Sequence, residues 1–157
     1  PDPEAAQLRI PPHSIEAEQS VLGGLLLDNQ AWDRIGDLVA DSDFYRDEHR
    51  RIFRQIRNLL ERAKPADVVT VAEALDAAGE GDQTGGLAYL GELAANTPSA
   101  ANIRRYAEIV RERSVLRQLV ATADEIAADA LNPLGRDAES LLDEAESKIF
   151  KIAEAVK

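Results

Sequence analysis

Two glycines in the segment 86–91 have the spacing of a phosphate-binding loop, in which backbone N–H groups surround the phosphates of a nucleotide. Gly86 and Gly91 match that spacing, but Glu92 stands where such loops carry lysine, and Leu93 where they carry serine or threonine. A carboxylate at that place repels phosphate. We therefore expect no nucleotide site here, and we interpret the two glycines as positions where helices pack closely.

The two histidines, His13 and His49, are the side chains best suited to acid–base chemistry near neutral pH. His49 falls on the apolar side of an expected helix with Ile52 and Phe53, which favours a buried, hydrogen-bonded histidine over a catalytic one. His13 directly precedes the expected cap of a helix at Ser14 and is interpreted as structural. No pair of nucleophile and base is recognisable, so the sequence predicts no catalytic residue and no bound cofactor.

Acidic residues between 41 and 48 resemble part of a calcium-binding loop, in which carboxylates alternate around an invariant glycine. Arg46 occupies the position of that glycine, so we reject a calcium site. The chain also has no cysteine, which excludes disulfides and thiolate metal sites. The sequence therefore predicts no metal centre.

Four arginines fall on one side of an expected helix at 46–62, namely Arg46, Arg50, Arg54 and Arg57. One interpretation is a solvated face balanced by nearby acidic residues. A second is a surface that meets an acidic partner or a neighbouring copy of the chain. A third is contact with DNA, although no aromatic residues alternate with these arginines to stack on bases.

The elements that carry these residues are all predicted to be helices. Alanine and leucine dominate and β-branched residues form no long runs, so the fold class is all-α. We expect a disordered lead-in at 1–12 and a globular multi-helix head at 13–99. Within the head, adjacent Gly23 and Gly24 indicate close approach of another helix. Thr70 with Glu73 is interpreted as a capping box.

The longest element is a helix predicted at 100–131, with Ser99 as its N-cap. A turn at 132–136 and a last helix at 137–156 follow. Because the connection is short, residues 100–157 are predicted to form an antiparallel helical hairpin.

The apolar stripe of the long helix changes direction near Glu112. Before that point, Ile103, Tyr106 and Val110 are expected to pack against the head. After it, six residues are expected to meet the last helix: Leu116, Leu119, Val120, Ala123, Ala127 and Ala130.

The last helix carries apolar residues at the spacing of a coiled-coil seam: Ala138, Leu142, Ala145, Ile149, Ile152 and Val156. Three further hydrophobic residues, Ile126, Leu141 and Phe150, lie off that seam. They are either exposed surface residues or the contact through which two copies of the hairpin associate.

The net charge of −11 opposes binding to phosphate backbones. No apolar run reaches the length of a membrane span and no secretion signal is recognisable, so we expect a soluble, cytoplasmic protein. The chain begins at Pro1 and contains no methionine, from which we expect it to be a piece of a longer protein.

Several segments, in order along the chain, resemble the N-terminal domain of bacterial replicative DNA helicases of the DnaB type. The resemblance is carried by PHSIEAEQSVLG at 12–23, DFY at 43–45 with His49, PADVVT at 65–70, GGLAYL at 85–90, PSAANI at 98–103 and YAEIV at 106–110. It covers about residues 12–120 closely and the final hairpin by architecture.

The resemblance implies that hairpins pair two copies of the domain, and that three such pairs form a collar on a hexameric ring. It implies that the collar recruits primase through the C-terminal domain of primase, within the primosome. It further implies that ATP, magnesium and DNA belong to the full-length helicase, whose motor domain has no match here. The expected location is then the replication fork at the nucleoid.

Two other functions stay open beside this one. The chain could be an all-α interaction module of another system, or a weak binder of single-stranded DNA. The ordered motifs favour the helicase domain over a generic module, and the charge of −11 counts against the DNA binder.

Overall fold

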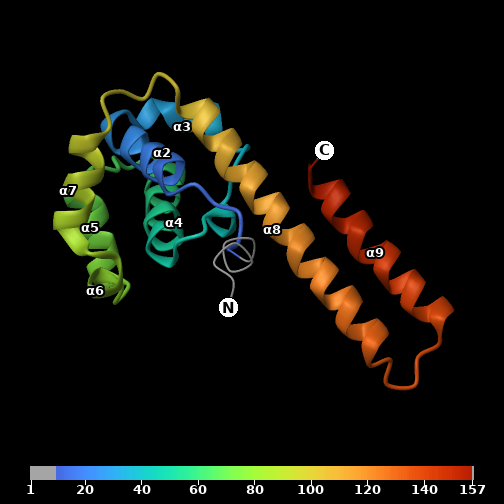
Figure 1. Ribbon diagram of the computed structural model, residues 1–157. Helices are drawn as coiled ribbons and strands as arrows, with labels where there is room; N and C mark the ends of the chain where they lie inside the picture. The colour runs from blue at the N-terminus through green and yellow to red at the C-terminus, as the bar shows by residue number, and fades with distance from the viewer. Residues whose placement is uncertain (1–9, 157) are drawn as a thin grey trace. The chain divides into compact units, whose positions relative to one another are not determined.

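The structure is a computed structural model that describes residues 10–156. All longer elements in that range are helices and no strand occurs among them, as predicted for an all-α chain (Figure 1). The helices are α2 (Ile15–Leu27), α3 (Trp32–Ile35), α4 (Asp47–Glu61), α5 (Val68–Ala77), α6 (Gly81–Thr84), α7 (Gly86–Asn96), α8 (Ile103–Leu131) and α9 (Ala138–Val156), with 3₁₀ turns at Asn29–Ala31 and Asp41–Asp43. None of the described helices is long and apolar enough to cross a membrane. Most of the lead-in predicted at 1–12 lies outside the described residues.

The described chain divides into two compact units, which we call the head unit (residues 13–113) and the hairpin unit (residues 114–156 with 10–12). Helix α8 begins in the head unit and ends in the hairpin unit. The sequence places this division earlier, between residues 99 and 100. The difference arises because Ile103, Ala107 and Val110 are buried in the core of the head unit.

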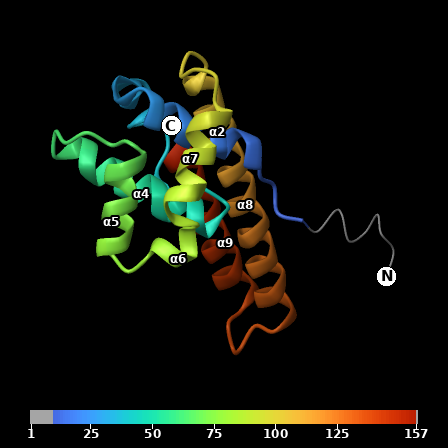
Figure 2. The ribbon, with the colours of Figure 1, turned by 90° about the vertical axis from the view of Figure 1, so that its left-hand side faces the viewer.

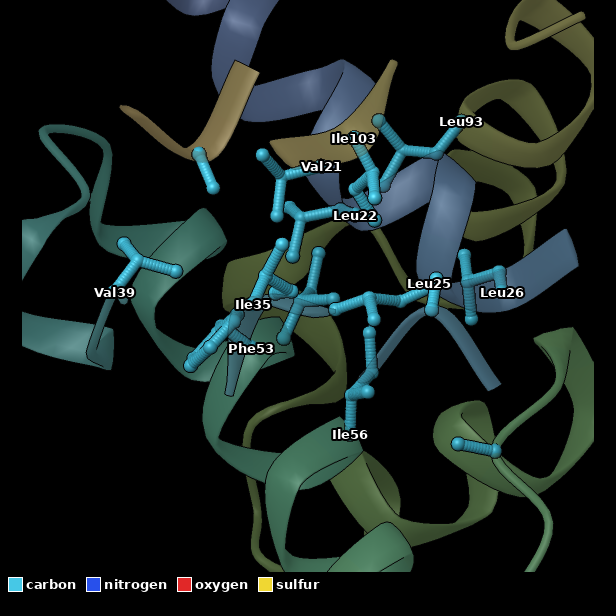
Figure 3. Packing of buried hydrophobic residues seen from close by; sticks show 14 of the residues in the cluster. Val21, Leu22, Leu25, Leu26, Ile35, Val39, Phe53, Ile56, Leu93 and Ile103 are labelled. Carbon is cyan, nitrogen blue, oxygen red and sulfur yellow. The ribbon is translucent and has the colours of Figure 1, made fainter. Parts of the chain in front are cut away.

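Helix α2 is the centre of the head unit because nearly all of its sides are covered. Val21, Leu22 and Leu25 are fully buried. Figure 3 shows them among Ile35, Phe53, Ile56, Leu93 and Ile103, which come from four other helices. The helix begins where the sequence predicts, since the hydroxyl of Ser14 accepts a hydrogen bond from the N–H of Ala17 at 3.2 Å.

Gly23 and Gly24 lie where α2 meets α7 and the start of α8. A Cβ atom on Gly23 would collide with the side chain of Thr97 and lie 2.5 Å from the carbonyl oxygen of Leu93. A Cβ on Gly24 would lie 3.0 Å from Ile103. The predicted close approach is therefore confirmed at these two glycines.

The packing interpretation is wrong for the two glycines of the segment 86–91. A Cβ on Gly91 would meet no atom within 4 Å. Gly86 has φ +56° at the first turn of α7, so its role is conformational. Their spacing in the sequence does not reflect helix contact.

Replacing Gly23 with alanine is expected to lower the free energy of unfolding by about 1–3 kcal/mol, because the added methyl group overpacks the contact with α7. Gly91→Ala is the matched control, and it should raise the free energy of unfolding by about 0.5–1 kcal/mol because alanine favours the helix. Urea denaturation followed by circular dichroism measures both. Changes of the same sign and size would contradict the packing role of Gly23.

Two predicted helix starts need correction. Helix α8 begins at Ile103, and Ser99 caps only the preceding turn, where its hydroxyl accepts from the N–H of Ala101 at 3.3 Å. Helix α5 begins at Val68 and is capped by Asp67, not by Thr70 with Glu73. The Asp67 carboxylate accepts from the Thr70 N–H and the Thr70 hydroxyl accepts from the Asp67 N–H, each at 2.8 Å. These reciprocal bonds satisfy two N–H groups at the helix start.

Candidate functional site

The hairpin unit contains an apolar cavity between α8 and α9, which run antiparallel side by side (Figures 1 and 2). The cavity has a volume of about 280 Å³, and Ile126, Leu141, Leu142 and Ala145 line it together with charged residues. The sequence places Ile126 and Leu141 off the seam of the hairpin. That placement is wrong, because both residues lie between the two helices.

The true seam contains charged residues, which explains the error. From residue 118 on, the less exposed positions of α8 are 118, 122, 126 and 129, and those of α9 are 141, 145, 148 and 152. Lys148 therefore faces inward, where its Nζ lies 3.4 Å from Asp129 and 3.1 Å from Glu125. A prediction that uses apolar residues alone assigns the neighbouring Ile149 to the helix interface, although Ile149 is 43% exposed.

The turn of the hairpin is held by one arginine. Arg136 donates to the carbonyl of Pro133 at 2.9 Å, to Glu144 at 2.7 Å and to Asp129 at 3.2 Å. The hydrogen bond from Arg136 holds the pKa of Asp129 below its usual value. These contacts join the last turn of α8 to the first turns of α9. Two exposed leucines beside them, Leu131 and Leu134, are absent from the predicted site residues.

Six apolar residues beside the seam face solvent, and together they form what we call the outer apolar face. Leu119, Ala123, Leu142 and Ile149 each directly follow an inward position, and in antiparallel helices a shift of the same sense leads to the same face. Leu116 and Val120 lie further round α8 from the seam. The outer apolar face comprises Leu116, Leu119, Val120, Ala123, Leu142 and Ile149, all of them exposed. Phe150 is 62% exposed and lies roughly 100° further round α9.

The three residues expected to join the long helix to the head lie in the head unit. Ile103 and Val110 are buried in its core, and Tyr106 is partly buried against it. This part of α8 is therefore integral to the head.

The arginines of α4 lie together, and their charges are balanced inside the head. Arg54 bonds to Asp41 at 2.9 Å, and Arg57 lies 3.5 Å from the same carboxylate. Burial raises the pKa of Asp41, but the hydrogen bond from Arg54 and the charge of Arg57 outweigh this effect, so the pKa is lowered. Arg50 donates to the carbonyls of Phe44 and Tyr45. These contacts fasten the segment 41–45 onto α4.

Arg46 completes that row, with its guanidinium 3.9 Å from Glu48. These ion pairs agree with the first interpretation of the arginines, a face balanced by nearby acidic residues. A partner surface at these arginines stays a prediction.

A buried polar cluster joins α2, α4 and α7. His49 is fully buried, with Nδ1 at 2.8 Å from Glu18 Oε1 and Nε2 at 2.6 Å from the hydroxyl of Tyr89. The expectation of a buried and hydrogen-bonded His49 is confirmed. Glu18 is 1% exposed and also accepts from the N–H groups of Tyr45 at 2.7 Å and Arg46 at 3.4 Å.

Sequence reasoning missed Glu18 because it treats acidic residues in the first turn of a helix as partners of the helix dipole. The position of Glu18 in the sequence indicates its burial, because Glu18 falls on the apolar stripe of α2 with Val21, Leu22 and Leu25. A carboxylate on a buried stripe needs hydrogen-bond donors, and here they come from α4 and the segment before it. The contacts of the cluster hold the three helices together.

Known proteins of similar sequence indicate the family of this chain. The family model described as DnaB-like helicase N terminal domain matches residues 10–112. Replicative DNA helicase DnaB of Haemophilus influenzae is 48% identical over 153 residues, which are 98% of this chain and 33% of that protein. The enzyme of the same name from Pasteurella multocida is 46% identical over 92% of this chain and 31% of its own length. The chain thus spans about a third of the length of these relatives.

Solved structures agree with the sequence relatives. The crystal structure of the N-terminal domain of DnaB helicase from Mycobacterium tuberculosis has a TM-score of 0.87 and 38% identity, covering 90% of this chain and 99% of that one. A DnaB-like replicative helicase, described with its interactions with primase, has a TM-score of 0.71 at 23% identity, covers 88% of this chain and 31% of that one, and shows the fold alone. The chain belongs to the family of DnaB-like helicase N-terminal domains.

Proposed function

We propose that this chain is the oligomerisation and primase-docking domain of a hexameric replicative DNA helicase acting in the primosome. The observation that carries the proposal is the outer apolar face of the hairpin unit. In this proposal ATP, magnesium and DNA are handled by the full-length ring, in the cytoplasm at replication forks. The chain itself contributes assembly and recognition.

Pairing of two hairpins is supported by the exposure of that face. Leu142 is 64% exposed and Leu119 is 40% exposed, although both are large apolar side chains. Burying a fully exposed leucine is worth roughly 1.5–3 kcal/mol, and covering the exposed part of these side chains contributes a corresponding share. Two antiparallel hairpins that meet through these faces would form a four-helix bundle, in which every helix has a covered apolar side. Three such pairs would give the hexameric collar.

Docking of primase is supported by one structural neighbour, a DnaB-like replicative helicase whose structure was determined with its interactions with primase. On this chain, Phe150 lies beside the outer apolar face and is 62% exposed, so pairing leaves it available. Exposed aromatic residues often anchor protein interfaces. A site that uses surfaces of two paired copies would couple primase binding to assembly.

The test compares Ile149→Asp with Ser147→Asp. Ile149 belongs to the outer apolar face, whereas Ser147 lies on the opposite side of α9, so the two variants add the same charge in different places. We expect the wild-type chain and Ser147→Asp to be dimers or larger by light scattering at tens of micromolar, roughly where moderate interfaces saturate. Ile149→Asp should be monomeric, because association would bury its charge.

The same proteins are then titrated with the C-terminal domain of primase. We expect Phe150→Ala to keep the mass of the assembly and to weaken primase binding at least tenfold, about 1.4 kcal/mol. Ile149→Asp should weaken self-association and primase binding alike. A monomeric wild-type chain would contradict the oligomerisation role. An assembled chain with no measurable affinity for the primase domain would contradict the docking role.

A further inference from the structure

A polar cleft lies in the head unit where α2 packs against α7. Its volume is about 210 Å³. Seven polar side chains line it: Glu16, Gln19 and Ser20 from α2, Tyr89, Glu92 and Asn96 from α7, and Thr97 directly after α7. The cleft is distinct from the outer apolar face of the hairpin unit and from the arginines of α4.

The lining is rich in hydrogen-bond acceptors and negative charge. Glu16 and Glu92 are exposed at the cleft, one on each helix, and within residues 10–156 neither forms an ion pair or a side-chain hydrogen bond. No lysine or arginine lines the cleft. Two carboxylates that form no ion pair favour a cationic ligand and repel phosphate groups.

Hydrogen bonds hold the side chain of Tyr89 in place within the cleft. The hydroxyl of Tyr89 lies 2.6 Å from Nε2 of His49 and accepts a hydrogen bond from Gln19 at 3.2 Å. His49 is held in turn by buried Glu18. The ring of Tyr89 is therefore positioned by buried His49 and by partly buried Gln19. A ligand entering the cleft meets a surface that need not be ordered on binding.

We propose that this cleft receives the side chain of an arginine presented by a protein partner. A guanidinium group is planar and has five N–H donors, so it can bond to acceptors on both helices and stack on an aromatic ring. Glu16, Glu92 and the ring of Tyr89 supply those partners. The inference does not rest on hairpin pairing or on primase.

Size and ligand chemistry argue against other occupants. Sites for drug-sized ligands have volumes of about 300–1,000 Å³, so this smaller cleft suits one side chain better than a nucleotide. No group of three or more histidine, cysteine or acidic residues in the described chain is placed to hold a metal ion. A lysine ammonium is compact and would leave more of the acceptors without a donor.

The experiment is an NMR titration of the whole ¹⁵N-labelled chain with N-acetyl-arginine amide. We expect saturable shifts confined to the amides of residues 16–20 and 89–97. N-acetyl-citrulline amide has nearly the same shape without the charge and should cause no saturable shift. Glu16→Gln/Glu92→Gln should weaken arginine binding at least tenfold. The control Glu73→Gln/Glu139→Gln changes the net charge equally at exposed positions elsewhere and should bind as the wild type does.

Three results would overturn the proposal. Equal shifts with citrulline would show that charge is not recognised. Equal affinity of the Glu16→Gln/Glu92→Gln variant would show that arginine binds elsewhere or without these carboxylates. Shifts at residues 16–20 and 89–97 with Mg²⁺ or Ca²⁺, and none with the arginine amide, would identify a cation site instead.

Discussion

Replacing Glu18 with alanine is expected to lower the free energy of unfolding by about 3–5 kcal/mol, because three hydrogen-bonding groups lose a partner at once. Glu18 is 1% exposed and accepts hydrogen bonds from His49 and from the N–H groups of Tyr45 and Arg46. Without the carboxylate, His49 remains buried without this partner, and the N–H groups of Tyr45 and Arg46 lose their acceptor. Each such group carries a desolvation cost of its own.

Glu16→Ala is the matched control, because Glu16 lies one turn or less away on the same helix and is exposed. It should change the free energy of unfolding by less than about 1 kcal/mol, through the helix dipole alone. Glu18→Gln keeps the shape and one acceptor oxygen, so its effect should fall between the two. Urea denaturation monitored by circular dichroism measures all three. Equal effects of Glu16→Ala and Glu18→Ala would mean that the buried cluster does not stabilise the head.

The local features of this fold could be predicted because they depend on neighbours in the chain. The cap at Ser14 and the apolar stripe of α4 need only a few adjacent residues. The glycines at 23 and 24 also stand out, since two adjacent glycines inside a helix need a reason. His49 was recognised as buried from its own helical face.

The partners of these residues could not be predicted, because they lie far away in sequence. His49 meets Glu18 from 31 residues away and Tyr89 from 40 residues away. The cleft between α2 and α7 depends on the same long-range packing. No periodic pattern within one helix contains that information.

The hairpin shows a different limit. Its seam carries Lys148 and Asp129, which pair with each other between the helices. A hydrophobic pattern therefore assigns Ile149 to the inside and Leu141 to the outside, the reverse of what is found. Where an ion pair occupies a helix interface, apolar spacing alone selects the wrong face. The proposed self-association rests on the exposed residues that result.

The same substitution at two positions of α8 should separate folding from association. Val110→Asp is expected to lower the free energy of unfolding by about 4 kcal/mol or more, because Val110 is 2% exposed in the core of the head unit and the new carboxylate has no partner there. Leu119→Asp is expected to cost less than about 1 kcal/mol in the monomer, since Leu119 is 40% exposed. It should nevertheless abolish association through the outer apolar face.

Because association itself stabilises a folded chain by mass action, the unfolding measurements belong at concentrations where the monomer dominates. Hydrogen exchange then locates the damage: Val110→Asp should accelerate exchange throughout residues 13–113, and Leu119→Asp should leave that region protected. Light scattering at higher concentration should show Leu119→Asp as a folded monomer. If Leu119→Asp instead unfolds the chain as severely as Val110→Asp, the outer apolar face contributes to folding, and association must use another surface.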